Sequence, residues 1–241
     1  MNPTISVLTS VHLPNYLTES IESILSQTFE DFEFIIVNDG DGKNFNYIQK
    51  ILESYNDSRI KIIKNKKNIG LAKSLNLCLN KAKGDYFARH DGDDISLPNR
   101  FEKQLPLFKN KDVGVVSCWA QCINKDGNKI KSYWVDVIVK IPENAFYEFI
   151  KYQNCVLSPG SIFSRSVYEK IGYFDPEVIL AQDYNYWLRA IPHFKFKILP
   201  EILVKKREHN LNVWKKGNSQ WINIAKRRAI SNPYNPSNFK F

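Results

Sequence analysis

Acidic side chains gather in one short segment of the chain, residues 90–94, with the sequence His-Asp-Gly-Asp-Asp. If this segment is extended, side chains two apart point the same way, so Asp91 and Asp93 converge while Gly92 lets a ligand approach the backbone. Carboxylate oxygens suit a hard cation, and Mg²⁺ and Mn²⁺ usually bind one or two carboxylates together with substrate phosphates. The pair therefore predicts a metal and nucleotide site, with a solvated loop as the alternative. We expect Asp94 to cap the helix that follows Pro98.

The elements that position these acids alternate between short apolar runs and helical stripes, which is typical of βα units and a largely parallel sheet. We predict strands over residues 4–8, 32–37, 60–63 and 86–88, with helices over residues 17–25, 47–55 and 71–82 between them. Ligands of such sheets bind beyond the carboxyl ends of the strands. The polar residues that follow the predicted strands are therefore the candidate site.

Beyond Pro98 the pattern loosens and becomes mixed. We expect helices over residues 101–108, 143–152, 166–171 and 182–190, strands over residues 113–118, 161–163 and 194–199, and a hairpin turned at Asp126-Gly127. No linker or repeat interrupts residues 1–204. We predict one α/β domain there, with a mostly parallel central sheet flanked by helices, a Rossmann-like front half and a mixed back half on the acceptor side.

The positive charge of the chain is concentrated near its C-terminus. Residues 1–204 hold 25 Lys/Arg and 24 Asp/Glu, whereas residues 205–241 hold 9 and 1. A neutral body without a nucleic-acid-binding signature excludes a nucleic-acid partner. The basic tail places Trp221, Ile224 and Ala225 on one helical side. It predicts either a helix in peripheral contact with an anionic membrane or a helix docked on the body with solvated lysines.

Composition and motifs exclude several other classes. No apolar run reaches the roughly 18 residues of a membrane span and no secretory signal is visible, so a cytoplasmic location is expected. The four cysteines are too few for a disulfide scaffold or a zinc site, and we expect buried, reduced thiols. A dehydrogenase is excluded because no GxGxxG follows the first strand.

Seven stretches, taken in order, resemble a family 2 glycosyltransferase of the GT-A fold and cover most of residues 4–191. They are ISVLTS (5–10), SIESILSQTF (20–29), FEFIIVNDG (32–40), NIGLA (68–72), AKGDY (82–86), DGDD (91–94) and QDYNYWLR (182–189). The resemblance implies transfer of a hexosyl group from a nucleoside-diphosphate sugar, a UDP- or dTDP-sugar, with inversion and with Mn²⁺ or Mg²⁺. It implies a glycan or lipid-linked acceptor, in cell-surface polysaccharide or lipopolysaccharide synthesis at the inner face of the cell membrane.

The resemblance also implies roles for residues on the donor side. Thr9 and Asp39 match contacts to the donor nucleotide, and Asp39 is expected to accept a hydrogen bond from the imide N–H of a uracil or thymine ring. Asp91 and Asp93 match the motif that binds the metal and the diphosphate. A catalytically silent nucleotide- or sugar-binding module on the same fold is the alternative function. Such a module would lose Asp93 or Asp183, and both are present.

Two further residues have implied roles in catalysis. Asp183 matches the base that takes the proton of the acceptor hydroxyl, as a carboxylate about 3 Å away can do. The alternative for Asp183 is an acid in a first helical turn, stabilised by the helix dipole. His209 stands where a histidine can complete the metal shell, and a solvated tail histidine is the alternative.

Overall fold

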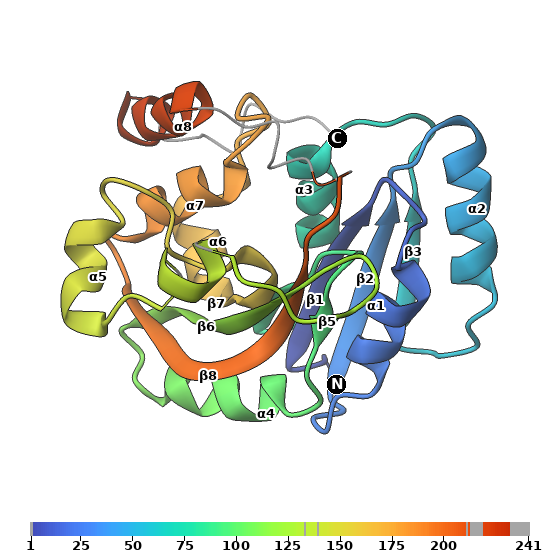
Figure 1. Ribbon diagram of the computed structural model, residues 1–241, viewed down its shortest axis with the longest axis horizontal. Helices are drawn as coiled ribbons and strands as arrows, with labels where there is room; N and C mark the ends of the chain where they lie inside the picture. The colour runs from blue at the N-terminus through green and yellow to red at the C-terminus, as the bar shows by residue number, and fades with distance from the viewer. Residues whose placement is uncertain (1, 133, 139, 211, 213–218, 232–241) are drawn as a thin grey trace.

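The computed structural model describes residues 2–132, 134–138, 140–210, 212 and 219–231, and a mixed eight-stranded sheet runs through them (Figure 1). The strand order is β3-β2-β1-β4-β7-β6-β8-β5. The strands are β1 (Ile5–Val11), β2 (Phe32–Asn38), β3 (Ile60–Lys64), β4 (Tyr86–Arg89), β5 (Ile95–Ser96), β6 (Val113–Ile123), β7 (Ile162–Ser164) and β8 (Lys195–Arg207). The first four strands pair in parallel, as does β6 with β8, whereas β7 and β5 pair antiparallel with their neighbours. The α/β class and the mostly parallel front half are thus confirmed.

Helices cover both faces of the sheet because β1 and β2 are apolar on both sides. Ile5 and Val7 pack in a buried cluster with the helices of one face, whereas Leu8 and Ile35 pack with those of the other. The first face holds α1 (Leu17–Leu25), α2 (Gly42–Glu53) and α4 (Arg100–Gln104); the second holds α3 (Leu71–Lys81), α6 (Arg165–Ile171) and α7 (Gln182–Ala190). None of the described helices is long and apolar enough to cross a bilayer.

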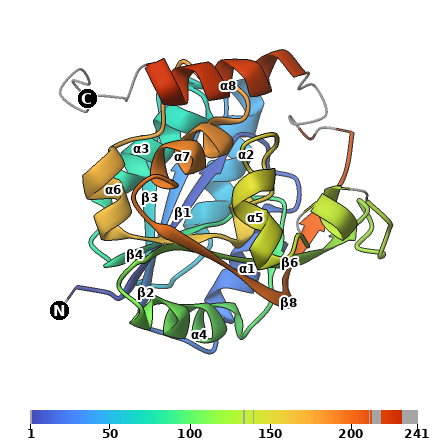
Figure 2. The ribbon, with the colours of Figure 1, turned by 90° about the vertical axis from the view of Figure 1, so that its left-hand side faces the viewer.

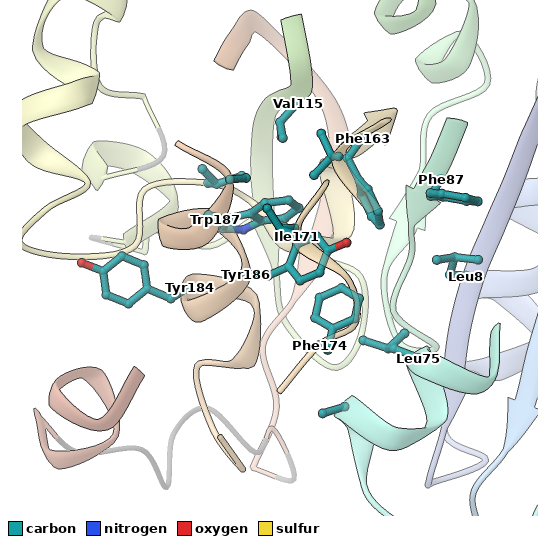
Figure 3. Packing of buried hydrophobic residues seen from close by; sticks show 14 of the residues in the cluster. Leu8, Leu75, Phe87, Val115, Phe163, Ile171, Phe174, Tyr184, Tyr186 and Trp187 are labelled. Atoms are coloured by element: carbon teal, nitrogen blue, oxygen red, sulfur yellow. The ribbon is translucent and has the colours of Figure 1, made fainter. Parts of the chain in front are cut away.

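A cluster of buried aromatic side chains packs around α7 (Figure 3). Tyr184, Tyr186 and Trp187 are each 0% exposed, and the ring of Tyr186 stacks on Phe174 with centroids 4.2 Å apart. Aromatic pairs of this kind add about 0.5–1.5 kcal/mol beyond the area they bury. Helix α7 is therefore fixed in the core, and so is its first turn, which carries Asp183.

The segments around the predicted hairpin and the helix after Pro98 differ from expectation. A single bridge joins Ile123 to Lys129, so the hairpin at Asp126-Gly127 has no second strand. Helix α4 ends at Gln104 and continues as the 3₁₀ turn η1 (Leu105–Lys109), because Pro106 has no N–H for an α-helical bond. The remaining short elements are η2 (Trp134–Ile138), α5 (Glu143–Phe149) and η3 (Ser158–Gly160).

The last strand is longer than predicted. Strand β8 pairs with β6 up to Leu199 and again from Ile202, so that Pro200 and Glu201 bulge out of the ladder without ending it. The strand predicted from the sequence covers residues 194–199 and so ends before this bulge. The predicted boundary after residue 204 therefore cuts through β8, which continues to Arg207.

Helix α8 (Ser219–Ser231) lies across α7, as Figure 2 shows. Ala225 is 0% exposed, and its carbonyl oxygen accepts from Nδ2 of Asn185 at 3.0 Å. Arg228 pairs with Asp175 at 2.6 Å. Helix α8 thus docks on the body, as one of the two predicted arrangements has it, and contact with a membrane stays a prediction.

Candidate active site

The acidic segment after β4 is a turn and not an extended run. The backbone N–H of Asp94 donates to the carbonyl oxygen of Asp91 at 3.3 Å. The prediction that Asp91 and Asp93 point the same way from an extended backbone is therefore wrong. Their carboxylates instead bind different partners, so the two acids have separate surroundings.

Asp91 is paired with a buried arginine at the end of β4. Nη2 of Arg89 donates to Oδ1 of Asp91, and Nη1 donates to the carbonyl oxygen of Leu8, both at 2.9 Å. The Arg89 side chain is 2% exposed and that of Asp91 is 33% exposed. Because a buried charge needs a partner, Asp91 neutralises Arg89 while part of its own carboxylate remains open to solvent.

Asp93 is held by the segment that follows β8. Its Oδ2 lies 2.9 Å from Nε2 of His209 and accepts from Nδ2 of Asn212 at 3.1 Å. The backbone N–H of His209 donates to Oδ1 of Asn212 at 2.5 Å, so these two residues support each other. Burial opposes ionisation of Asp93, but His209 and the nearby charge of Lys206 outweigh it and hold the pKa of Asp93 below its ordinary value. We call Asp93, His209 and Asn212 the Asp93 junction.

Arg207, the last residue of β8, fastens this junction to α1. Its guanidinium donates to the carbonyl oxygen of Asp93 at 3.1 Å, pairs with the carboxylate of Glu19, and lies 4.3 Å above the ring of Tyr16. The ring of Tyr16 also packs against that of His209, with centroids 5.3 Å apart. The chain after β8 is thereby directed over the acidic turn.

Asp94 is a structural residue of this turn. Its Oδ1 accepts from the backbone N–H of Arg207 at 2.7 Å, and burial raises its pKa well above the ordinary value. Helix α4 begins after Asn99 without any side-chain cap. The predicted capping role of Asp94 is wrong, because its carboxyl group is used by β8.

Asp39 follows β2 and is buried. Its Oδ1 accepts from Nδ2 of Asn65 at 2.8 Å and from the N–H of Ile69 at 2.9 Å, and its Oδ2 accepts from the N–H of Gly70 at 3.0 Å. These bonds shape the loop before α3. A carboxylate oxygen can accept two hydrogen bonds, so Oδ2 retains room for a ligand donor. The contact of Asp39 with a nucleotide stays a prediction.

Thr9 lies near the end of β1 and is 1% exposed. Its hydroxyl donates to the carbonyl oxygen of His90 at 2.8 Å, which ties β1 to the acidic turn. The ring of His90 is enclosed, with Nε2 at 2.8 Å from Oγ of Ser20, and burial together with the charge of Arg100 lowers its pKa to about 3. Thr9 therefore positions the turn, and its contact with a nucleotide stays a prediction.

Helix α7 begins directly after the left-handed residue Ala181, whose φ is 63°. Asp183 is the second residue of this helix and lies in its first turn. Its Oδ1 accepts from the N–H of Tyr184 at 2.8 Å, and its Oδ2 accepts from Nδ2 of Asn154 at 2.9 Å. Burial raises the pKa of Asp183, although Tyr184 and the charge of Arg89 act against this rise. A carboxylate whose pKa is raised toward neutrality is a better proton acceptor.

A divalent metal fits part of this arrangement. Among the residues that the structure describes, no three His, Cys, Asp or Glu side chains converge in a set that could hold a metal ion alone. Asp93 and His209 nonetheless face each other with a carboxylate oxygen and an imidazole nitrogen, donor types that Mn²⁺ accepts. Mg²⁺ and Mn²⁺ are commonly held by one or two side chains plus substrate phosphates. The pair suits a metal shared with a phosphorylated ligand.

Sequence reasoning missed four polar residues that position the candidate site. Arg89 carried a signal, since a charge at the end of an apolar strand must be buried with a partner. Asn154, Arg207 and Asn212 carried none, because they lie in loop-like or basic stretches and meet their partners only through the fold.

The family model described as Glycosyl transferase family 2 matches residues 6–172. An uncharacterized glycosyltransferase of Methanocaldococcus jannaschii is 38% identical over 202 residues, which are 81% of this chain and 67% of the relative. The O-antigen biosynthesis glycosyltransferase WbnJ of Escherichia coli is 36% identical over 223 residues, which are 88% of this chain and 82% of the relative.

The fold is also similar to that of a solved mannosyltransferase, PcManGT from Pyrobaculum calidifontis, in complex with GDP-Man and Mn²⁺. The TM-score is 0.71 at 15% sequence identity, and the match covers 98% of this chain and 67% of that one. At this identity the likeness concerns the fold alone.

Proposed function

Because the chain belongs to family 2 of the glycosyltransferases, we propose that it transfers a hexosyl group from a nucleoside-diphosphate sugar to an acceptor hydroxyl. The fold is GT-A. In the proposed reaction the acceptor oxygen attacks the anomeric carbon, the bond from that carbon to the diphosphate breaks, and the configuration inverts. The nucleoside diphosphate leaves, and the acceptor proton passes to a carboxylate of the protein.

The observation that carries this proposal is the Asp93 junction. The fold brings His209 against Asp93 across 116 residues of sequence. The sequence alone predicts both as candidate metal ligands. Asp93 and His209 would hold Mn²⁺ or Mg²⁺ together with the donor diphosphate. Such a metal, when bound, stabilises the negative charge that develops on the departing diphosphate.

Asp183 is the proposed base. A sugar hydroxyl is a poor nucleophile until its proton is removed, and general-base catalysis contributes about 10² to 10⁴ in rate. The buried carboxylate, with its raised pKa and fixed position at the start of α7, supports this assignment. Asp91, which forms an ion pair with Arg89, is proposed to contact the donor, and so are Asp39 and Thr9.

The donor and acceptor classes are also proposals. We favour a UDP- or dTDP-sugar because the resemblance implies a contact between Asp39 and the uracil or thymine ring of the donor. We also favour a glycan or lipid-linked acceptor in cell-surface polysaccharide synthesis. The O-antigen name of the Escherichia coli relative supports the acceptor class. We further propose a cytoplasmic enzyme in peripheral contact with the membrane through the outward face of α8, which exposes Arg227 and Ile230.

The test is a donor screen that measures nucleotide release and product formation with UDP-, dTDP- and GDP-sugars, with and without Mn²⁺. Asp183→Asn is expected to lower the rate of transfer by about 10² or more while donor affinity changes little. Glu177→Gln, an acid outside the site, serves as the control. Asp183→Asn turnover near that of the wild type would place the base elsewhere, and inactivity with every donor would favour the silent binding module.

A further inference from the structure

Among the residues that the structure describes, one side chain outside α7, that of Asn154, donates a hydrogen bond to the carboxylate of Asp183. Nδ2 of Asn154 donates to Oδ2 of Asp183 at 2.9 Å, and Oδ1 of Asn154 accepts from the backbone N–H of Val156 at 3.1 Å. This second bond fixes which end of the amide faces the acid. Asn154 therefore presents an N–H₂ donor to Asp183 and cannot turn its oxygen toward it without losing the bond to Val156.

The segment that carries Asn154 is fastened on both sides. The hydroxyl of Tyr184, the residue after Asp183, donates to the carbonyl oxygen of Ile150 at 2.6 Å. Nζ of Lys226 on α8 donates to the carbonyl oxygen of Tyr152 at 2.7 Å. Beyond Asn154 the chain enters the core, where Val156 is 0% exposed. The donor is thus held rigidly relative to α7.

We propose that Asn154 is a positioning residue for the base: its amide holds the Asp183 carboxylate in one orientation and favours its ionised form. This inference rests on the proposed role of Asp183. A hydrogen bond to the charged form of an acid stabilises that form, and here it acts against the burial that disfavours charge. Fixing a reacting group in one orientation also raises its effective concentration toward the acceptor.

The expected signature lies in the pH dependence of transfer. The groups that act on Asp183 are the N–H of Tyr184, the positive charge of Arg89, the amide of Asn154 and the negative charge of Asp91. Removing the Asn154 donor leaves burial less opposed, so the pKa of Asp183 rises further. The base must be ionised to act, so the loss of activity with falling pH should then begin at a higher pH than in the wild type. The maximal rate should also drop.

The experiment compares Asn154→Ala and Asn154→Asp with the wild type. The alanine variant is expected to lower kcat about tenfold, with donor KM within about twofold, and to move the acid limb of the kcat profile to higher pH. The aspartate variant keeps an acceptor for Val156 but sets a carboxylate against Asp183, so it should move the limb further. Should the alanine variant fold poorly, the aspartate variant still decides the question.

Asn76→Ala is the matched control. The side chain of Asn76 is buried and bonds both backbone groups of Phe174, at 2.8 and 2.9 Å, and neither bond involves Asp183. This variant should lower stability and leave the acid limb unmoved. An unmoved limb in folded Asn154→Ala and Asn154→Asp would overturn the proposal.

A readout that needs no turnover separates this inference from the proposed function. The side-chain carboxyl carbon of Asp183, assigned by its loss in Asp183→Asn, is titrated by ¹³C NMR in the wild type and in Asn154→Ala. If Asp183 is not the base, Asp183→Asn remains active, yet the carboxyl should still titrate at higher pH when Asn154 is removed. An unchanged titration would overturn the pairing whatever the enzyme does.

Discussion

The two sides of the candidate site are built from different ranges of sequence. On the donor side, Asp39 binds the N–H groups of Ile69 and Gly70, 30 and 31 residues later, within one run of βα units. On the other side, Asp93 binds His209 and Asn212, 116 and 119 residues later. The donor side is therefore shaped by its own strands and loops, whereas the side that would hold metal depends on where the chain returns after β8.

This difference changes the meaning of the basic C-terminal segment. Arg207, His209 and Asn212 lie on the acidic turn, and Lys226 on α8 supports the loop of Asn154. A segment that sequence analysis set apart as a charged tail thus supplies side chains to Asp93 and to the loop that carries Asn154. The predictions below test that dependence, beginning with the largest effect.

Loss of α8 should have the largest effect. Deleting residues 219–241 removes Ile222 and Ala225, exposes the core residues that they cover, and removes the hydrogen bonds of α8 to Asn185 and Tyr152. We therefore expect the free energy of unfolding to fall by about 3 kcal/mol or more. Urea denaturation and the transfer rate would measure the loss. Ala225→Arg, on the buried side, should reproduce it, whereas Asn223→Ala, on the exposed side, should not. A truncated chain of normal stability and activity would mean that α8 does not support the fold, and would favour the membrane-contact alternative for this segment.

The Asp93 junction should show a graded loss of metal binding. In the presence of nucleoside diphosphate, Asp93→Asn should weaken Mn²⁺ binding at least about a hundredfold, with His209→Ala next. Asn212→Ala should cost about tenfold, the lower end of the range for residues that orient metal ligands. Isothermal titration with UDP present would measure each affinity. Equal Mn²⁺ affinity in all three variants would remove the metal from this junction, and Asp85→Asn on the surface is the control.

Local patterns were sufficient to predict the front of the sheet. Strands β1 to β4 and helices α1 and α3 follow apolar runs and stripes whose partners are the next elements along the chain. The end of β8 was missed because Pro200 and the lysines after it are typical of a strand end, and only pairing with β6 carries the chain past them. Asp94 was misassigned for the same reason: its partner is the backbone of Arg207, which no local pattern shows.

The candidate site residues have two sources in the sequence. Asp91 and Asp93 are candidates because acids cluster in one short segment, whereas Asp39, Asp183 and His209 are candidates through the resemblance to the family. The groups that orient them are asparagines and arginines in stretches of ordinary composition, and their role exists only through contacts such as that of Asn154 with Asp183.

A smaller effect is expected from the buried histidine on the donor side. Burial lowers the pKa of His90 to about 3, with Arg100 and Arg89 lowering it and Ser20 and Asp93 opposing them. The unfolded chain binds a proton at His90 below about pH 6.5 and the folded chain does not, so stability is lost as pH falls below 6.5. Between pH 6.5 and 5 the loss from this group is about 2 kcal/mol.

Replacement of His90 would reveal this contribution. His90→Gln should be less stable than the wild type at pH 7 yet show a shallower fall in the free energy of unfolding between pH 7 and 5, measured by urea titration at each pH. Asn76→Ala, which removes a buried side chain that does not titrate, should lower stability and leave the slope unchanged. Parallel slopes for the wild type and His90→Gln would mean that His90 binds a proton in the folded chain.

The smallest effect concerns the proposed membrane contact of α8, and it follows from how the helix docks. Three consecutive basic residues lie on α8: Lys226 binds the carbonyl oxygen of Tyr152, Arg228 binds Asp175, and Arg227 has an exposed side chain. A basic residue near an anionic surface contributes about 1 kcal/mol, so Arg227→Gln should weaken binding to phosphatidylserine vesicles about fivefold. Arg228→Gln should instead lower stability, because it leaves the carboxylate of Asp175, which is 2% exposed, without its partner.

Vesicle co-sedimentation at several salt concentrations would measure the membrane contact, since screening shortens the reach of surface charges to a Debye length of about 8 Å at physiological ionic strength. Vesicle binding that weakens with salt and with Arg227→Gln would support two roles for α8. Its inner face would support the loop of Asn154, and its outer face would contact the membrane. Wild-type protein that stays in the supernatant at low salt would contradict the membrane contact. The charge of α8 would then serve the fold alone, through Lys226 and Arg228.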